Sequence, residues 1–345
     1  ASDDAPLMVH EGMAAVHMPP ELVQEVQADY LREAEVIWNR VLQPAVQGAP
    51  AIADRRFGGK AWLAQPGASF AAELYLLNAR ALTRLAHGLE ADEKTKRRIE
   101  FAVLQFVDAT SPSNFLALNP EALQKALETR GESLMQGMSH LWKDMQRGHV
   151  SQTDESAFEV GRNVATTEGS VVFENELFQL LEYKPLTAKV FERPILFVPP
   201  CINKFYILDL QPENSFIRYT VAEGHRVFVL SWKNAGEAIA QRSWDDYIEH
   251  AAIRAIALVQ EISGQKKINT LGFCIGGTIL STALAVLAAR GEKPAASMTL
   301  LTTFLDFSDT GILDIFIDEP GVRLREMTLG AESPNGGNLL KGQEL

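Results

Sequence analysis

Cysteine is scarce in this chain, with only Cys201 and Cys274 among 345 residues. Two cysteines cannot build the disulfide framework of a small secreted protein, so a reducing cytoplasm is expected and a thiol is available for chemistry. Positive charge is scarce as well: the formal net charge is −12, and the longest basic cluster lies at 94–98. A nucleic-acid partner is therefore not expected, because such an interface needs clustered Lys and Arg.

Signatures of metal and nucleotide sites are also missing. The seven histidines include no His-x-x-x-His pair and have no cysteine nearby, so no metal site is expected. Glycines 272, 276 and 277 do not have Gly-x-Gly-x-x-Gly spacing, and no Lys-Ser/Thr pair follows them as in a phosphate-binding loop. The first twelve residues carry three acidic side chains and no apolar run, which argues against a signal peptide.

One uncharged stretch, residues 268–289, is long enough to span a bilayer. Gly276-Gly277 interrupts it, and Asn269 and Thr270 are poorly suited to face lipid. A buried strand followed by a buried helix has the same appearance. The strand–helix interpretation is favoured, because the rest of the chain supplies the other strands that such a sheet requires.

Residues 1–160 are expected to form an all-helical N-terminal domain. Apolar residues recur there at helical spacing, and no strand pattern interrupts them. Asn119 is a predicted N-cap, with Pro120 at the first helical position. Helices are expected at about 20–42, 70–88, 92–110, 119–127 and 134–145, followed by a polar linker at 151–162.

Beyond the linker the pattern changes to α/β. Strands are expected at 171–183, 195–199, 227–232, 268–273 and 297–304. Helices are expected at 212–222, 243–262 and 277–289, the second beginning with a Ser243/Asp246 capping box. Strands that alternate with helices in this way form right-handed crossovers and a mostly parallel sheet.

The segment Gly272-Phe273-Cys274-Ile275-Gly276 lies where a predicted strand ends and a buried helix begins, a context typical of a nucleophile elbow. The two glycines lack the Cβ atoms that would crowd so tight a turn. A thiol at a helix N-terminus faces unpaired N–H groups, which favours the nucleophilic thiolate. The Ile275 N–H is placed to donate to an oxyanion. The alternative, a small buried cysteine beside glycines that permit close packing, is less favoured in this strand–helix context.

A second oxyanion donor is expected from the loop at 198–206, which follows an earlier strand. The Ile202 N–H is the candidate, because Pro199 and Pro200 have no N–H to offer. Cys201 is expected to line the pocket and not to act as a second nucleophile, since no helix begins directly behind it.

A histidine is missing where it is needed. In the α/β-hydrolase order the nucleophile is followed by an acid and then a histidine, but no histidine follows Cys274. His250 is expected on a helix surface, and His225 at the wrong edge of the sheet. The triad Asp and His are thus expected to be absent from this chain, whose ends look like those of an inactive fragment. Four aspartates do follow the nucleophile: Asp306, Asp309, Asp314 and Asp318.

Over essentially its whole length the sequence resembles the polyhydroxyalkanoate synthases, class I in particular. The most specific stretches are PPCINKFYILDL at 199–210, SWDDY at 243–247 and GFCIGGT at 272–278, with SPSNF at 111–115 and GRN at 161–163 upstream. The resemblance implies an incomplete α/β-hydrolase fold over residues 161–345. It also implies the start of a cap at about 306–345, although an ordinary helix covering the sheet explains 306–329 equally well.

The resemblance implies an acyltransferase that polymerises (R)-3-hydroxyacyl-CoA, typically 3-hydroxybutyryl-CoA, while Cys274 holds the polyester as a thioester. Asp and His beyond residue 345 would complete the triad, and no metal or redox cofactor is implied. The family is cytoplasmic, associated with storage granules and homodimeric, and the helix at 21–42 is a hypothetical granule contact. A thioesterase or dienelactone-hydrolase-like enzyme with a Cys nucleophile, and a non-catalytic fragment, remain alternatives.

Overall fold

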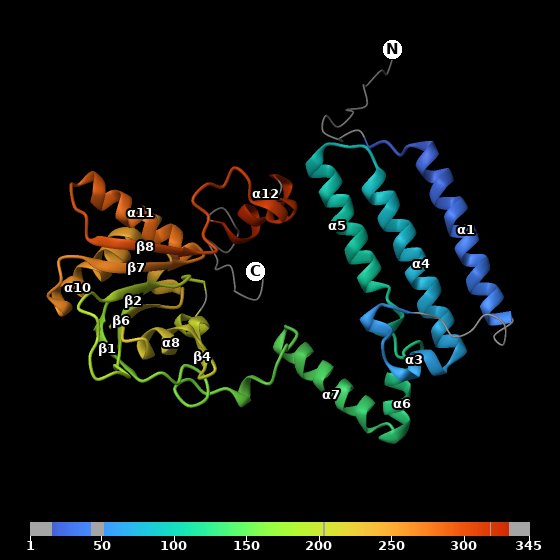
Figure 1. Cartoon of the computed structure of the whole chain (residues 1–345), viewed down its shortest axis with the longest axis horizontal. Helices are drawn as coiled ribbons and strands as arrows, with labels where there is room; N and C mark the ends of the chain where they lie inside the picture. Colours follow the sequence, from blue (N-terminus) through green and yellow to red (C-terminus); the bar gives the residue numbers. More distant parts are fainter. Residues whose placement is uncertain (1–15, 43–51, 203, 318, 331–345) are drawn as a thin grey trace, which may run out of the picture. The chain divides into compact units, whose positions relative to one another are not determined.

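The computed structural model describes residues 16–42, 52–202, 204–317 and 319–330. These residues form two compact units (Figure 1). The first unit draws on Ala1–Val150 and Ile312–Ile317, and the second on Ser151–Gly311 and Asp318–Leu345. Positions 1–15 and 331–345, the latter within the expected cap, lie outside the described residues.

The first unit is helical, as the sequence predicts. Its long helices α1, α4 and α5 lie side by side (Figure 1). Asn119 caps α6 by accepting hydrogen bonds from the N–H groups of Glu121 and Ala122, which confirms the predicted start of that helix. The helices are α1 (Pro20–Leu42), α3 (Lys60–Ala64), α4 (Pro66–Gly88), α5 (Glu93–Ala109), α6 (Pro120–Glu128) and α7 (Glu132–Arg147), with short 3-10 turns at Arg55–Phe57, Pro112–Asn114 and, for all but its first residue, Gly311–Phe316.

The helices of this unit differ in how far their apolar faces are buried. The core of the unit is an aromatic cluster in which Phe57, Trp62 and Tyr75 make edge-on ring contacts. Helix α1 adds buried Val26 and Ile37. No residue of α7 is buried, although apolar residues recur along this helix at helical spacing.

The second unit is built on a six-stranded sheet of order β1-β2-β6-β3-β7-β8. Strands β6, β3, β7 and β8 are parallel, which confirms the predicted mostly parallel sheet, and β1 and β2 are antiparallel. The strands are β1 (Gly169–Glu174), β2 (Phe178–Tyr183), β3 (Ile195–Val198), β6 (Val227–Trp232), β7 (Ile268–Phe273) and β8 (Ala295–Leu301).

Alternation along β6 explains why the sheet is covered on both faces. Phe228 and Leu230 point to one face and join the core under α10 and α11, whereas Val227 and Val229 point to the other and pack under α8. All four side chains are fully buried. Each such side chain contributes about 1.5–3 kcal/mol relative to an exposed one.

The helices of this unit follow the predicted alternation with one irregularity. The helical stretch that begins at Trp244 contains a π-helical segment, Tyr247–Ile253, and starts with the predicted Ser243/Asp246 capping box. The remaining elements of this unit are α8 (Phe216–Ala222), α9 (Trp244–Asp246), α10 (Arg254–Ser263), α11 (Ile275–Ala289), α12 (Glu319–Leu329), the two-stranded pair β4 (Asp209–Gln211) and β5 (Asn214–Ser215), and 3-10 turns at Glu155–Ala157, Phe205–Leu208 and Glu237–Ile239.

Two predicted elements have other boundaries. The strand expected at 171–183 is a hairpin of β1 and β2, because the Asn175 side chain accepts hydrogen bonds from the N–H groups of Leu177 and Phe178 and turns the chain. The helix expected at 212–222 begins only at Phe216, where the Ser215 hydroxyl caps it. In both cases a polar side chain bonds to nearby backbone and ends the regular pattern.

The last predicted strand is also shorter than expected. Strand β8 ends at Leu301, because Thr302 adopts a left-handed conformation with φ of 43°. The uncharged stretch at 268–289 forms β7 and α11, which confirms the strand–helix interpretation. Within the described part of the chain, no helix has the length and apolarity to cross a membrane.

Candidate active site

Cys274 lies at the sharp turn between β7 and α11. Its backbone has φ of 53° and ψ of −130°, a strained conformation for a residue with a side chain and the one expected at a nucleophile elbow. The residue is exposed. Its N–H donates to the Leu301 carbonyl at 2.9 Å, so the turn is tied to the end of β8 while the thiol remains accessible.

Close approach of backbone explains the glycines around Cys274. A Cβ on Gly276 would lie 2.2 Å from the Val198 carbonyl oxygen and 2.4 Å from that of Pro199. A Cβ on Gly272 would lie 2.3 Å from the Gly277 Cα. Such distances are far inside van der Waals contact, so both positions require glycine. The chain after β3 therefore lies directly against the first turn of α11.

Both candidate oxyanion donors belong to this junction. Ile275 is the first residue of α11, and its N–H makes no hydrogen bond among the described residues. Ile202 belongs to the loop after β3, and its N–H is likewise without a partner within the described part. Strands β3 and β7 pair in parallel with Val198 opposite Gly272, so the two loops leave the sheet side by side. This edge, where β3, β6, β7 and β8 end, is called the carboxyl edge below.

Cys201 lies in the same region but in a different environment. It is half-buried and packs against the core cluster of the sheet. Burial raises the pKa of the Cys201 thiol, and negative charge on the neighbouring Cys274 adds to the rise. A thiol held in its neutral form is a poor nucleophile, which agrees with a lining role for Cys201.

Trp232 is a site residue that the sequence analysis did not single out. It ends β6, is 9% exposed, and donates its indole N–H to the buried Pro199 carbonyl at 2.7 Å. This bond anchors the loop that carries Ile202. The only sequence signal was an aromatic residue with a hydrogen-bond donor at the carboxyl end of a buried strand.

The described histidines and aspartates that could be triad partners make contacts away from Cys274. His250 is exposed and lies 3.7 Å from Asp246 on its own helical stretch. His225 precedes β6 at the opposite edge, and its ring packs against that of Phe191 at a tilt of 43°. The Asp306 and Asp309 carboxylates each accept a hydrogen bond from the backbone N–H of the residue two positions later in the chain. Asp314 forms an ion pair with Lys94 at 2.8 Å. Asp318 lies outside the described residues.

Comparison with known proteins gives the family. Residues 53–220 match the model described as the N-terminus of poly-beta-hydroxybutyrate polymerase (PhaC), and residues 194–343 match the alpha/beta hydrolase fold. The chain is 58% identical over 335 residues to the poly(3-hydroxyalkanoate) polymerase subunit PhaC of Cupriavidus necator, a match that covers 97% of this chain. The chain belongs to the poly(3-hydroxyalkanoate) polymerase family.

Other members of the polymerase family match over a similar range. The chain is 39% identical to the poly(3-hydroxyalkanoate) polymerase of Methylorubrum extorquens and 35% identical to the polymerase subunit PhaC of Rhizobium meliloti, each over 94% of this chain. The matches cover 57%, 57% and 56% of the Cupriavidus, Methylorubrum and Rhizobium proteins, so the chain spans somewhat more than half the length of these relatives.

Solved structures show only a weak similarity to this chain. A fungal esterase from Rhizomucor miehei is 14% identical, with a TM-score of 0.35, over 50% of this chain and 57% of its own. A putative lipase from Sulfolobus solfataricus is 12% identical, with a TM-score of 0.32, over 43% of this chain and 49% of its own. The second unit has the α/β-hydrolase fold that the sequence predicts.

Proposed function

We propose that this chain carries the nucleophile of an acyltransferase that polymerises (R)-3-hydroxyacyl-CoA, with 3-hydroxybutyryl-CoA as the principal substrate. The observation that carries the proposal is the strained, exposed Cys274 at the start of α11. Membership of the polymerase family supports the reaction. The neighbouring Ile275 and Ile202 N–H groups are suited to stabilise negative charge on an acyl oxygen.

The proposed chemistry has two transfers. The Cys274 thiolate attacks the thioester carbonyl, and collapse of the oxyanion breaks the bond to the coenzyme sulfur, which leaves as CoA and takes up a proton. The 3-hydroxyl of another unit then loses its proton and attacks the acyl-enzyme, forming an ester and breaking the bond to Cys274. A sulfur nucleophile suits the first step, because exchange of one thioester for another is nearly balanced in energy. The CoA thioester is the substrate, and these steps use no metal or redox cofactor.

Both transfers need a base, and the described surroundings of Cys274 contain no histidine in that role. We place the triad Asp and His in a part of the polymerase outside residues 1–345, consistent with the greater length of the relatives. The base removes the proton from the thiol and later from the hydroxyl. The chain of 345 residues alone is therefore expected to be inactive.

The proposal is tested with the full-length polymerase and 3-hydroxybutyryl-CoA. A polymerase releases CoA together with polymer, whereas a thioesterase of the same fold releases CoA together with free acid. Cys274→Ala should lower CoA release by on the order of 10³-fold or more, because it removes the atom that forms the covalent intermediate. Trapping with an acyl-CoA analogue whose acyl group transfers to the thiol with loss of CoA, but carries no 3-hydroxyl for a further transfer, should label Cys274.

Cys201→Ala is the matched control, since it removes the other thiol near the elbow. It should retain CoA release within a fewfold of the parent and should still be labelled at Cys274. Loss of activity in Cys201→Ala with full activity in Cys274→Ala would overturn the assignment of the nucleophile. Release of free acid without polymer would show that the enzyme is a hydrolase and would reject the proposed polymerase function.

We further propose that the enzyme is cytoplasmic, works as a homodimer at the surface of the polyester granule, and uses α1 as one granule contact. Leu31, Trp38 and Leu42 recur at helical spacing along α1 and are exposed by 59%, 54% and 71%. Val26 and Ile37 occupy the buried face of the same helix. An exposed apolar stripe opposite a buried one is suited to an apolar partner surface.

A further inference from the structure

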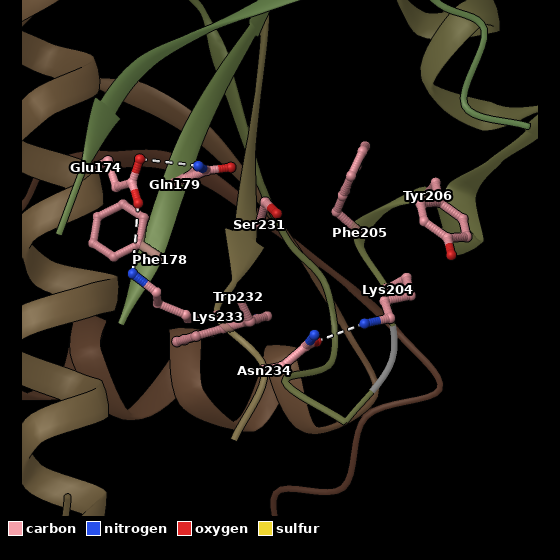
Figure 2. Close-up of a pocket in the computed structure, with 10 residues that line it drawn as sticks. All are labelled: Glu174, Phe178, Gln179, Lys204, Phe205, Tyr206, Ser231, Trp232, Lys233 and Asn234. Atoms are coloured by element: carbon pink, nitrogen blue, oxygen red, sulfur yellow. Dashed lines mark hydrogen bonds and ion pairs between the residues drawn. The ribbon is translucent and has the colours of Figure 1, made fainter. Parts of the chain in front are cut away.

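A cavity of about 290 Å³ opens at the carboxyl edge, around the end of β6 (Figure 2). Its walls come from the ends of β1 and β6, the start of β2, and the residues that follow the β3 loop. Trp232 forms part of the wall, and Phe178 and Phe205 add further aromatic surface. The mixture of apolar walls and a few charged groups is typical of sites for small molecules.

The cavity carries more positive than negative charge. Lys233 pairs with Glu174 at 3.5 Å, so these two charges offset each other. Lys204 bonds to the neutral side chain of Asn234 and has no carboxylate partner among the described residues (Figure 2). An unbalanced ammonium group in a chain of net charge −12 is a suitable contact for an anion.

The cavity shares a wall with the nucleophile elbow. Trp232 lines it and donates to the Pro199 carbonyl, and Pro199 in turn lies against Gly276 in the first turn of α11. Trp232 and the loop at Pro199 therefore link the wall of the cavity to the turn that holds Cys274. A substrate with its acyl group at the elbow could reach the cavity with another part of the same molecule.

We propose that this cavity binds the phosphate-bearing end of the coenzyme A thioester, with Lys204 contacting a phosphate. The inference rests on the proposed function, because it assumes that a CoA thioester reaches Cys274. A volume of about 290 Å³ suits part of the coenzyme and not the whole. A Lys ammonium binds phosphate as a point charge, and the aromatic walls offer a surface for the adenine ring.

The test compares Lys204→Ala with Lys204→Arg in the full-length enzyme, using 3-hydroxybutyryl-CoA and 3-hydroxybutyryl-pantetheine, which lacks the nucleotide. Lys204→Ala should raise KM for the CoA thioester by about fivefold to tenfold, as loss of one partly exposed charge contact predicts. The preference for the CoA thioester over the pantetheine thioester should fall by the same factor. Lys204→Arg keeps the charge and should restore most of that preference.

Lys189→Ala is the matched control, because Lys189 is exposed before β3, away from the carboxyl edge. It should leave the preference unchanged. Titration calorimetry can measure the affinity of CoA itself for the full-length Cys274→Ala enzyme. Adding Lys204→Ala to that enzyme should weaken CoA binding and make the CoA affinity less dependent on salt concentration. If the Lys204→Ala enzyme still makes polymer and keeps both its preference for the CoA thioester and its affinity for CoA, this inference is overturned and the proposed function stands. Absence of polymer from the parent enzyme would instead reject the proposed function.

Discussion

At the scale of single residues, the candidate active site depends on backbone held in an unfavourable conformation. Cys274 has a positive φ that costs about 1–3 kcal/mol and persists only where the surroundings determine it. The hydrogen bond from Cys274 to Leu301 and the glycine contact with Pro199 supply those surroundings. The hydrogen bond from Trp232 to Pro199 likewise holds the neighbouring loop in place.

Trp232→Phe should therefore reduce catalysis and not substrate binding. The change keeps a ring in the wall but leaves the buried Pro199 carbonyl without its donor, at a cost of about 1–3 kcal/mol. A loosened loop stabilises the oxyanion less well, so kcat should fall about tenfold with KM nearly unchanged. Rapid-quench measurement of acyl-enzyme formation in the full-length enzyme checks this expectation.

Trp244→Phe is the control for the same substitution, since Trp244 is 45% exposed on α9. It should change neither kcat nor the melting temperature appreciably. A Trp232→Phe enzyme that melts earlier but forms the acyl-enzyme at the parental rate would make Trp232 a purely structural residue.

At the scale of elements, helices with similar sequence patterns have different roles. Helix α4 buries five residues in the helical unit, whereas α7 buries none although its apolar residues also recur at helical spacing. Helix α1 is intermediate, with a buried face and an exposed apolar stripe. A 3.6-residue period therefore predicts a helix, but not which of its faces a neighbour will cover.

Granule association should depend on the exposed stripe of α1. Leu31→Gln with Leu42→Gln removes apolar surface from the stripe and spares the buried Val26 and Ile37, so the helix should remain folded. Co-sedimentation of the full-length protein with polyester granules should fall about threefold or more, as expected for the loss of two apolar contacts. Deletion of residues 1–42 should have a larger effect.

Leu186→Gln with Leu210→Gln is the control, because both leucines are exposed in the second unit. That pair should leave co-sedimentation unchanged. Granule association that survives both the stripe variant and the deletion would count decisively against α1 as a contact.

At the scale of the whole molecule, β8 forms one edge of the sheet, and no strand of the described residues pairs with its outer side. Strand β8 is the last strand in the described sheet, and residues 296–299 along it are exposed. An exposed strand edge offers unpaired backbone groups to another chain. The isolated 345-residue polypeptide is therefore expected to self-associate in solution.

Light scattering of the 345-residue chain should detect concentration-dependent association. Met298→Lys should reduce it, because Met298 is 44% exposed in the middle of β8 and a charge there opposes strand pairing. Met135→Lys, at an exposed site on α7, is the matched control and should have a smaller effect. A monodisperse monomer at high concentration would contradict the expectation.

Much of the fold follows from local patterns in the sequence. The spacing of apolar residues predicted the helices of the first unit other than the short α3, and the order of strands and helices in the second, because burial of one face requires that spacing. The position of Cys274 at a strand-to-helix turn followed from its flanking glycines, since a tight turn leaves no room for a Cβ. Asn119 and the Ser243/Asp246 pair marked helix starts for an equally local reason.

Only the tertiary structure decided which distant groups meet. The contact between Gly276 and Pro199, the bond from Trp232 to that same proline, and the cavity beside Lys204 join segments far apart in the chain. The exposure of α7 was likewise outside the reach of local pattern. The physical reason is that a sequence period specifies which face of an element is apolar, whereas packing of the whole chain selects the neighbour that covers it.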